Sequence, residues 1–147
     1  MNTPQYPEQL LLRTLAMPAD TNPNGDIFGG WIMSQMDIAG GILAKSATRG
    51  RIVTVAVDSM KFIQPVAVGD TVCCYGKIEK VGNTSIAINL EVWIAKSWGE
   101  NPEETERRLV TEATFTYVAI DPKGNKRNIN ATTIPDKYQT SSKQISG

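Results

Sequence analysis

A single carboxylate stands in the most apolar stretch of the chain. Asp37 is the only ionisable residue between Ile27 and Leu43. Because an ionised carboxylate that is buried without partners costs several kcal/mol, Asp37 requires hydrogen-bond donors, a bound proton, or a water-filled pocket beside it. A carboxylate in such a place can act as a general base or as a nucleophile.

A pair of glycines, Gly29-Gly30, precedes the helix that this stretch predicts. Glycines there allow a ligand to approach backbone N–H groups at the positively polarised start of the helix. A developing oxyanion would fit the same place. A tight loop explains the two glycines equally well, and a hydrogen-bonded core residue explains Asp37. The residue types alone therefore leave a structural and a functional interpretation open.

The helix that carries Asp37 is predicted from apolar residues at spacings of four, three and four, which are Ile32, Met36, Ala39 and Leu43. Ile38 and Ile42 widen this stripe, so we expect most of the helix circumference to be buried. Gly40-Gly41 lies inside the pattern, where each glycine weakens a helix by roughly 1 kcal/mol. The close approach of another backbone is the compensation that we expect.

Composition excludes several classes of function. The 147 residues are enough for one domain with its own core. Fifteen basic and fifteen acidic residues give a formal net charge of zero, which predicts neither nucleic acid nor an anionic membrane as a partner. The first residues lack the pattern of a secretory signal, and the run 27–43 is too short and glycine-rich to span a membrane. We expect a cytoplasmic protein.

The chain contains no histidine, which rules out Ser-His-Asp catalysis, Cys-His catalysis and His-rich zinc sites within it. Cys73 and Cys74 are adjacent, so in a strand they point to opposite faces and cannot jointly bind a metal or readily form a disulfide. We expect both cysteines to be packing residues, and we predict no metal site.

Alternating apolar residues predict five strands, at residues 10–17, 52–64, 71–80, 85–96 and 109–120. Gly82-Asn83 is typical of a two-residue hairpin, residues 97–105 of an exposed loop, and residues 121–124 of a turn. The order is one strand, one long helix, then four strands, which we expect in meander order. An antiparallel sheet wrapped around a central helix, an α+β fold, satisfies this pattern. We predict a domain at 8–123 and a polar, partly disordered tail at 124–147.

The sequence resembles the hotdog-fold acyl-CoA thioesterases, and among them the YciA-type acyl-CoA hydrolases, from about residue 10 to about residue 128. The residues that carry the resemblance are Leu12-Arg13-Thr14-Leu15-Ala16-Met17-Pro18, Asp20-Thr21-Asn22, Gly25-Asp26-Ile27-Phe28-Gly29-Gly30-Trp31-Ile32-Met33, Met36-Asp37, Gly69-Asp70, Thr111-Glu112-Ala113 and Phe115-Thr116-Tyr117-Val118-Ala119.

The resemblance implies a hotdog fold, two protomers side by side with a continuous sheet, and three such dimers in a homohexamer. It places the active sites at the dimer interface. Asp37 would be the catalytic carboxylate, and Asn22 of the other protomer would be its partner. The start of the helix at Gly29-Gly30 would hold the thioester carbonyl, with the Gly30 N–H stabilising the oxyanion.

The resemblance also implies a site for the nucleotide of coenzyme A (CoA). It lies around the turn Val81-Gly82-Asn83-Thr84-Ser85 and near the basic pair Lys126-Arg127. Many relatives have a basic residue in this turn, where this chain has Asn83. Without the resemblance, we would interpret Asn22 as an Asx-turn residue, Gly82-Asn83 as a hairpin turn and Lys126-Arg127 as a solvated pair.

Hydrolysis of a thioester needs a positioned water, a base and donors for the carbonyl oxygen, and a carboxylate with a helix start supplies these. The predicted reaction releases free fatty acid and CoA without any cofactor. A non-catalytic acyl-CoA binding or sensing protein on the same fold is the alternative. A hotdog hydratase or dehydratase is a further alternative, but it would normally use a histidine, which this chain lacks.

Overall fold

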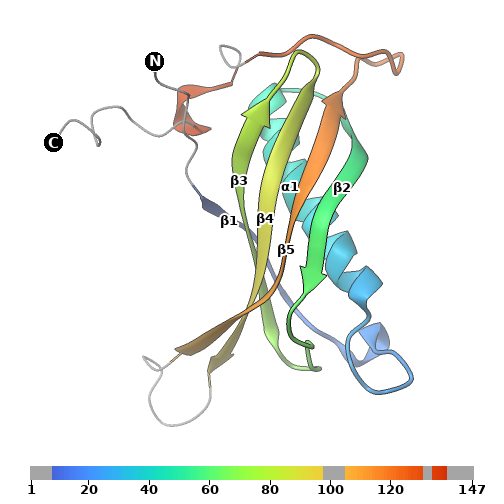
Figure 1. The fold of residues 1–147 in the computed structure, drawn as a ribbon, viewed down its shortest axis with the longest axis vertical. Helices are drawn as coiled ribbons and strands as arrows, with labels where there is room; N and C mark the ends of the chain where they lie inside the picture. The colour runs from blue at the N-terminus through green and yellow to red at the C-terminus, as the bar shows by residue number, and fades with distance from the viewer. Residues whose placement is uncertain (1–7, 98–104, 131–133, 139–147) are drawn as a thin grey trace, which may run out of the picture.

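The computed structural model describes residues 8–97, 105–130 and 134–138. One helix and five strands account for most of these residues (Figure 1). They are β1 (Gln9–Leu15), α1 (Gly29–Thr48), β2 (Ile52–Phe62), β3 (Thr71–Val81), β4 (Ser85–Ser97) and β5 (Thr105–Ala119), with two short 3₁₀ helices, η1 (Pro18–Asp20) and η3 (Asp136–Tyr138).

The strands form one antiparallel sheet in the order β1-β3-β4-β5-β2. Figure 1 shows α1 lying along one face of this sheet, behind the strands. The sheet wrapped around one helix confirms the predicted α+β architecture. The meander order is wrong for β2, which pairs with β5 at the far edge. β1 occupies the edge of β3 where a meander would place β2, and β2 joins the opposite edge of the sheet instead.

The core lies between α1 and the inner face of the sheet. Every second residue of β4 is at most 1% exposed, as the alternation predicts: Ile86, Ile88, Leu90, Val92 and Ile94. In β5 the predicted inward set begins with Leu109, but a bulge opposite Val92 and Trp93 inserts one extra residue. Val110 is therefore buried in place of Leu109, which is only partly covered.

The helix buries one side and leaves the other open. Ile32, Met36, Ala39 and Leu43 are all at most 2% exposed. Ile38 and Ile42, however, are 52% and 46% exposed. The prediction of a mostly buried circumference is thus wrong for a single chain, because the sheet covers only one side of the helix.

Gly40 is needed for a different reason from the one predicted. A Cβ built there would collide with the hydroxyl of Tyr117 and lie 3.0 Å from a methyl of Leu90. Side chains from β5 and β4, and not a backbone, make the close approach. The hairpin also differs from the prediction, since three residues, Gly82 to Thr84, separate β3 from β4.

The described part of the tail packs onto the domain. Ile129 and Ile134 are 2% exposed, Tyr138 is 8% exposed, and all three belong to the core cluster. Residues 139–147, where we also predicted a disordered tail, lie outside the described residues, as does most of the predicted loop 97–105.

Candidate active site

Asp37 lies in the middle of α1, half-buried, with its side chain held by two strands. Its Oδ1 accepts hydrogen bonds from the Thr54 hydroxyl at 2.6 Å and from the Tyr117 hydroxyl at 3.2 Å. Thr54 and Tyr117 face each other in the β2–β5 register. Among the described residues, no donor reaches Oδ2. The carboxylate is therefore fixed through one oxygen, while the other can accept a proton.

Tyr117 is 1% exposed, and its hydroxyl also lies 3.0 Å from the backbone oxygen of Asp37. Burial, and then the neighbouring Asp37 carboxylate, raises the pKa of Tyr117 far above its usual range. The hydroxyl therefore stays protonated at any working pH. It acts as a hydrogen-bond donor to Asp37 and cannot itself be the base.

Asn22 closes the loop that leads into α1. Its Oδ1 accepts hydrogen bonds from the backbone N–H groups of Asn24 at 2.9 Å and Asp26 at 3.1 Å. This is the Asx-turn geometry that the residue types predict without any resemblance. The Asn22 Nδ2 group has no acceptor among the residues that the structure describes, so its hydrogens remain available to a ligand.

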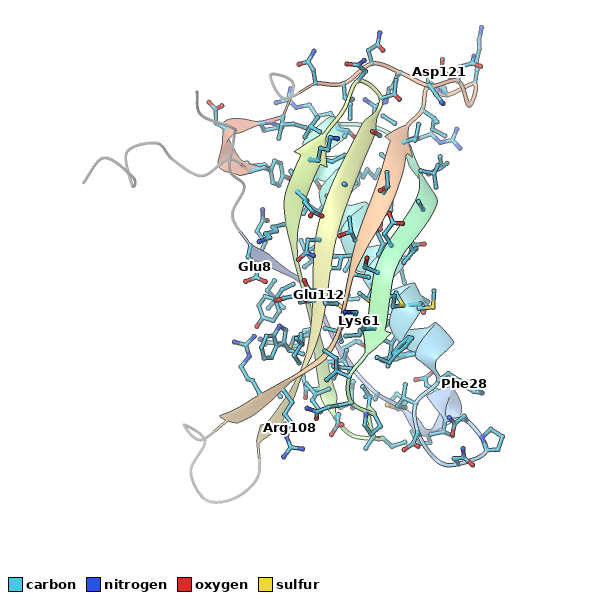
Figure 2. The ribbon with its side chains drawn as sticks, in the orientation of Figure 1. Glu8, Phe28, Lys61, Arg108, Glu112 and Asp121 are labelled. Carbon is cyan, nitrogen blue, oxygen red and sulfur yellow. The ribbon has the colours of Figure 1, made fainter. Side chains whose placement is uncertain are left out.

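Gly29 and Gly30 are the first two residues of α1 and do not form a separate loop before it. No side chain caps this end, where the exposed Phe28 is the N-cap residue (Figure 2). Within the described parts of the chain, the N–H groups of Gly29 and Gly30 have no acceptor. A Cβ added at Gly30 would meet nothing within 4 Å. These two donors are therefore available to a ligand.

One chain does not bring the carboxylate and the free amides together. Gly30 and Asp37 are seven helical positions apart, which is about 10 Å along the helix axis. Attack by a water held at Asp37 requires the oxyanion donors within hydrogen-bond distance of the same carbonyl oxygen. The amides of the same helix are too far away.

A single chain leaves several apolar side chains of α1 and β2 exposed. We call them the open-edge face, which consists of Ile38 and Ile42 of α1 with Val53, Val55 and Val57 of β2, each 37–55% exposed. Among the described strands, β2 lies at an edge of the sheet and pairs only with β5. Unpaired backbone groups and exposed apolar side chains on one edge are typical of a surface that another strand covers.

The turn between β3 and β4 lies beside the segment that follows β5. The N–H of Ile129 donates to the Asn83 oxygen at 2.6 Å, and the Ala119 N–H donates to the Thr84 oxygen at 2.8 Å. The two predicted CoA-binding regions are thus neighbours in space. Lys126 is exposed there.

The Arg127 side chain turns inward from the same segment. Its guanidinium donates to the Thr48 oxygen at 2.8 Å, the Thr48 hydroxyl at 3.1 Å, the Arg51 oxygen at 3.3 Å and the Ile120 oxygen at 3.1 Å. Gly50 leaves room for it, because a Cβ there would lie 2.6 Å from an Arg127 nitrogen. Arg127 thereby caps the C-terminal end of α1. It also lines an open pocket of about 560 Å³ together with Arg49 and Asn128.

Sequence reasoning missed Thr54 and Tyr117 as partners of Asp37. They lie 17 and 80 residues from it in the chain, so no local motif joins them. One signal was present: a tyrosine on the inward face of a strand needs a partner for its hydroxyl, and Asp37 is the polar residue of the apolar stripe.

An antiparallel five-stranded sheet curled around one long helix defines a hotdog fold. A family model described as the thioesterase superfamily matches residues 24–97. The acyl-CoA thioester hydrolase YciA of Salmonella typhimurium is 61% identical over 126 residues, which cover 86% of this chain and 92% of that protein.

Solved structures agree with this match. A variant of the hexameric broad-specificity acyl-coenzyme A thioesterase HI0827, in which an aspartate is replaced by alanine, has a TM-score of 0.80 and 57% identity, covering 88% of this chain and 91% of that one. A hexameric hotdog-fold thioesterase of Campylobacter jejuni has a TM-score of 0.77 and 42% identity, covering 84% and 92%. The chain belongs to the thioesterase superfamily, and within it to the YciA-type acyl-CoA thioester hydrolases.

No helix among the described residues is both long and apolar enough to cross a membrane. In the same residues, no group of three or more histidine, cysteine, aspartate or glutamate side chains is arranged to hold a metal ion.

Proposed function

We propose that this protein hydrolyses acyl-CoA thioesters to a free fatty acid and CoA, with Asp37 as the catalytic carboxylate. The observation that carries the proposal is the state of its two oxygens. Oδ1 is held by the Thr54 and Tyr117 hydroxyls, and Oδ2 has no donor among the described residues. An oriented carboxylate with one free oxygen beside an apolar surface suits a base that acts on a water next to an acyl chain.

In the proposed reaction, Oδ2 takes a proton from water while the water oxygen attacks the thioester carbonyl carbon. The resulting oxyanion is stabilised by the free N–H of Gly30, at the positive end of a helix dipole. Collapse of the intermediate breaks the C–S bond, and the proton held by Asp37 passes to the CoA sulfur. Direct attack by Oδ2, through a transient anhydride, uses the same atoms. No cofactor is required besides the CoA of the substrate.

The proposed site is shared between two protomers. Since Gly30 lies about 10 Å along the helix from Asp37 of its own chain, the oxyanion donor must come from a second copy. A two-fold axis that pairs the open-edge faces would cover Ile38, Ile42 and the β2 valines and extend the sheet across both chains. It would bring the other protomer's Gly30 and Asn22 to Asp37, where the free Asn22 amide orients the water. The hexamers of the solved relatives favour three such dimers.

We place the CoA nucleotide at the end of the sheet formed by Val81 to Ser85 and the segment around Lys126. The hydrogen bond between Ile129 and Asn83 supports this placement, because it holds the two regions against each other. Lys126 is an exposed cation of this segment and can contact a phosphate. Arg127 contributes by fixing the segment to the end of α1.

A thiol-release assay over a panel of acyl-CoA chain lengths tests the activity. We expect release with several substrates, and no release with any of them would leave a non-catalytic acyl-CoA binding protein as the function. Mixed oligomers test the shared site. Asp37→Asn and Asn22→Ala chains, each inactive or slow alone, should together regain about a quarter of wild-type turnover, since half the dimers then hold one intact site of two. No recovery on mixing, with subunit exchange verified, would place both residues in one chain's site.

A further inference from the structure

We propose that Tyr117 is a positioning residue for Asp37: its hydroxyl, seated against Gly40, holds the carboxylate so that Oδ2 faces the open-edge face. This inference rests on the proposed role of Asp37 as the catalytic carboxylate. It adds a residue that acts through Asp37 and does not touch the substrate.

The hydroxyl of Tyr117 has two acceptors on one residue. Its oxygen lies 3.0 Å from the Asp37 backbone oxygen and 3.2 Å from Oδ1. One hydroxyl hydrogen serves both, and it favours Oδ1 when the carboxylate is ionised, because hydrogen bonds to charged acceptors are the stronger ones. When Asp37 takes a proton from water, the backbone oxygen remains as an acceptor. The buried hydroxyl is thus satisfied throughout the reaction, and no step leaves it unpaired.

Tyr117 and Thr54 hold the same oxygen from different environments. Thr54 is exposed on the edge strand β2, whereas Tyr117 is 1% exposed on β5, packed beside Phe115 with ring centroids 6.4 Å apart. A side chain embedded in a packed core keeps one rotamer. Tyr117 is therefore the rigid support of the carboxylate, and Thr54 is the support that depends on the edge strand.

Gly40 makes room for this support. A Cβ at residue 40 would collide with the Tyr117 hydroxyl and lie 3.0 Å from the adjoining ring carbon. Any larger residue must push the hydroxyl away from Asp37. The cost of a glycine in mid-helix, roughly 1 kcal/mol, is offset here by a hydrogen bond to the catalytic side chain.

The test is Tyr117→Phe, which removes the hydroxyl and keeps the ring. We expect kcat to fall about 10- to 100-fold with KM changed less than about twofold, because an interaction that acts in the transition state is lost while binding is kept. Tyr138→Phe, which removes the hydroxyl of another buried tyrosine, is the matched control and should leave both quantities unchanged.

A double-mutant cycle with Gly40→Ala separates positioning from packing. The added methyl should reduce kcat in the wild-type background and have a smaller effect in Tyr117→Phe, where the hydroxyl is gone. Equal effects in both backgrounds, or an unchanged kcat in Tyr117→Phe, would overturn the inference.

A readout without turnover keeps this test independent of the proposed function. Carbon-13 NMR of labelled aspartate compares the chemical shift of the Asp37 carboxyl in wild type and in Tyr117→Phe at one fixed pH, because the variant removes the hydroxyl that lies 3.2 Å from Oδ1. If wild type releases no thiol from any acyl-CoA, the proposed function fails, yet a changed chemical shift in the variant would still support the Tyr117 contact. An active wild type with identical chemical shifts in the two proteins would refute the positioning role alone.

Discussion

The two ends of α1 differ in whether the fold caps their backbone groups. At the C-terminal end, Arg49 adopts a left-handed conformation, and the Arg127 guanidinium donates to the oxygens of Thr48, Arg51 and Ile120. At the N-terminal end, Phe28 offers no cap, and the N–H groups of Gly29 and Gly30 lack acceptors among the described residues. Both ends have unpaired backbone groups in an isolated helix, yet the fold satisfies only one of them.

This difference separates structural from functional polar groups. An end that is capped by a residue from another element contributes to stability, while an end left with free donors is available to a ligand that carries negative charge. The proposed oxyanion site is the uncapped end. The capped end makes Arg127 a weaker candidate for a phosphate contact than Lys126, because the Arg127 guanidinium already donates four hydrogen bonds within the chain.

The largest loss of kcat is expected for Asp37→Asn, in the middle of α1 between the two ends. It keeps the size of the side chain and removes its ability to accept a proton, so kcat should fall by roughly 10²- to 10⁴-fold. Melting temperature and oligomer size should be retained. Single-turnover hydrolysis, thermal denaturation and size-exclusion chromatography on one preparation measure activity, melting temperature and oligomer size. Full activity per folded site would exclude Asp37 as the base.

At the uncapped end, Gly30→Pro removes one N–H and is compatible with the first turn of a helix. We expect kcat to fall by about 10²- to 10³-fold, the usual loss for one oxyanion donor. Gly30→Ala is the matched control, because it keeps the N–H and its Cβ meets nothing within 4 Å. Should the alanine variant lose as much activity as the proline variant, shape and not the donor would be responsible.

At the capped end, Arg127→Met should act on stability. It removes the guanidinium donor from the oxygens of Thr48 and Ile120, while the Arg51 oxygen keeps the Ile120 N–H, and we expect the free energy of unfolding to fall by about 2–4 kcal/mol. Urea denaturation measures it, with Lys126→Met as a control that should change by less than about 0.5 kcal/mol. Turnover per folded site should persist in Arg127→Met. A large kcat loss with unchanged stability would instead make this end part of the active site.

Stability measured over a pH series separates the contribution of the Arg127 cap from that of a titrating group in the sheet, Cys74. Burial, and then the charge of Cys73, raises the pKa of Cys74 from 9.0 to about 12. Because the unfolded thiol ionises first, its contribution to stability is complete below pH 9.0 and is lost as the pH rises towards 12, by at most about 1.4 kcal/mol per pH unit. Arginine does not titrate in this range, so wild type and Arg127→Met should lose equal stability. A widening gap between them would tie the cap to a titrating group.

Local patterns predicted the elements well. The inward residues of β4 and the Asx turn of Asn22 follow from spacing and residue type, and the observed strands begin and end within a few residues of the predicted bounds. β5 begins at Thr105, four residues before the predicted start. The bulge at Val110 was not predictable, because alternation carries no signal for one extra residue.

Pairings between residues far apart in the chain could not be predicted from the sequence. The position of β2 depends on which edge of the sheet it joins, and the Thr54 contact with Asp37 depends on that position. The Tyr117 contact depends on how the sheet packs on α1. Asp37 could be selected as a candidate because its charge conflicts with its apolar surroundings. Its supports could not, because a threonine in a strand is common and the inward face of Tyr117 becomes informative only once the register is known.

The supports of α1 arrive late during synthesis. Tyr117 lies 80 residues beyond Asp37, and Arg127 lies 79 residues beyond Thr48. The ribosome synthesises the whole of α1 long before β5. A nascent chain therefore contains the Asp37 carboxylate before Tyr117 can support it, and α1 before Arg127 can cap its C-terminal end. Closing loops of this length slows folding. Because the proposed site also needs a second protomer, the onset of thioesterase activity should follow both the completion of β5 and the pairing of two chains.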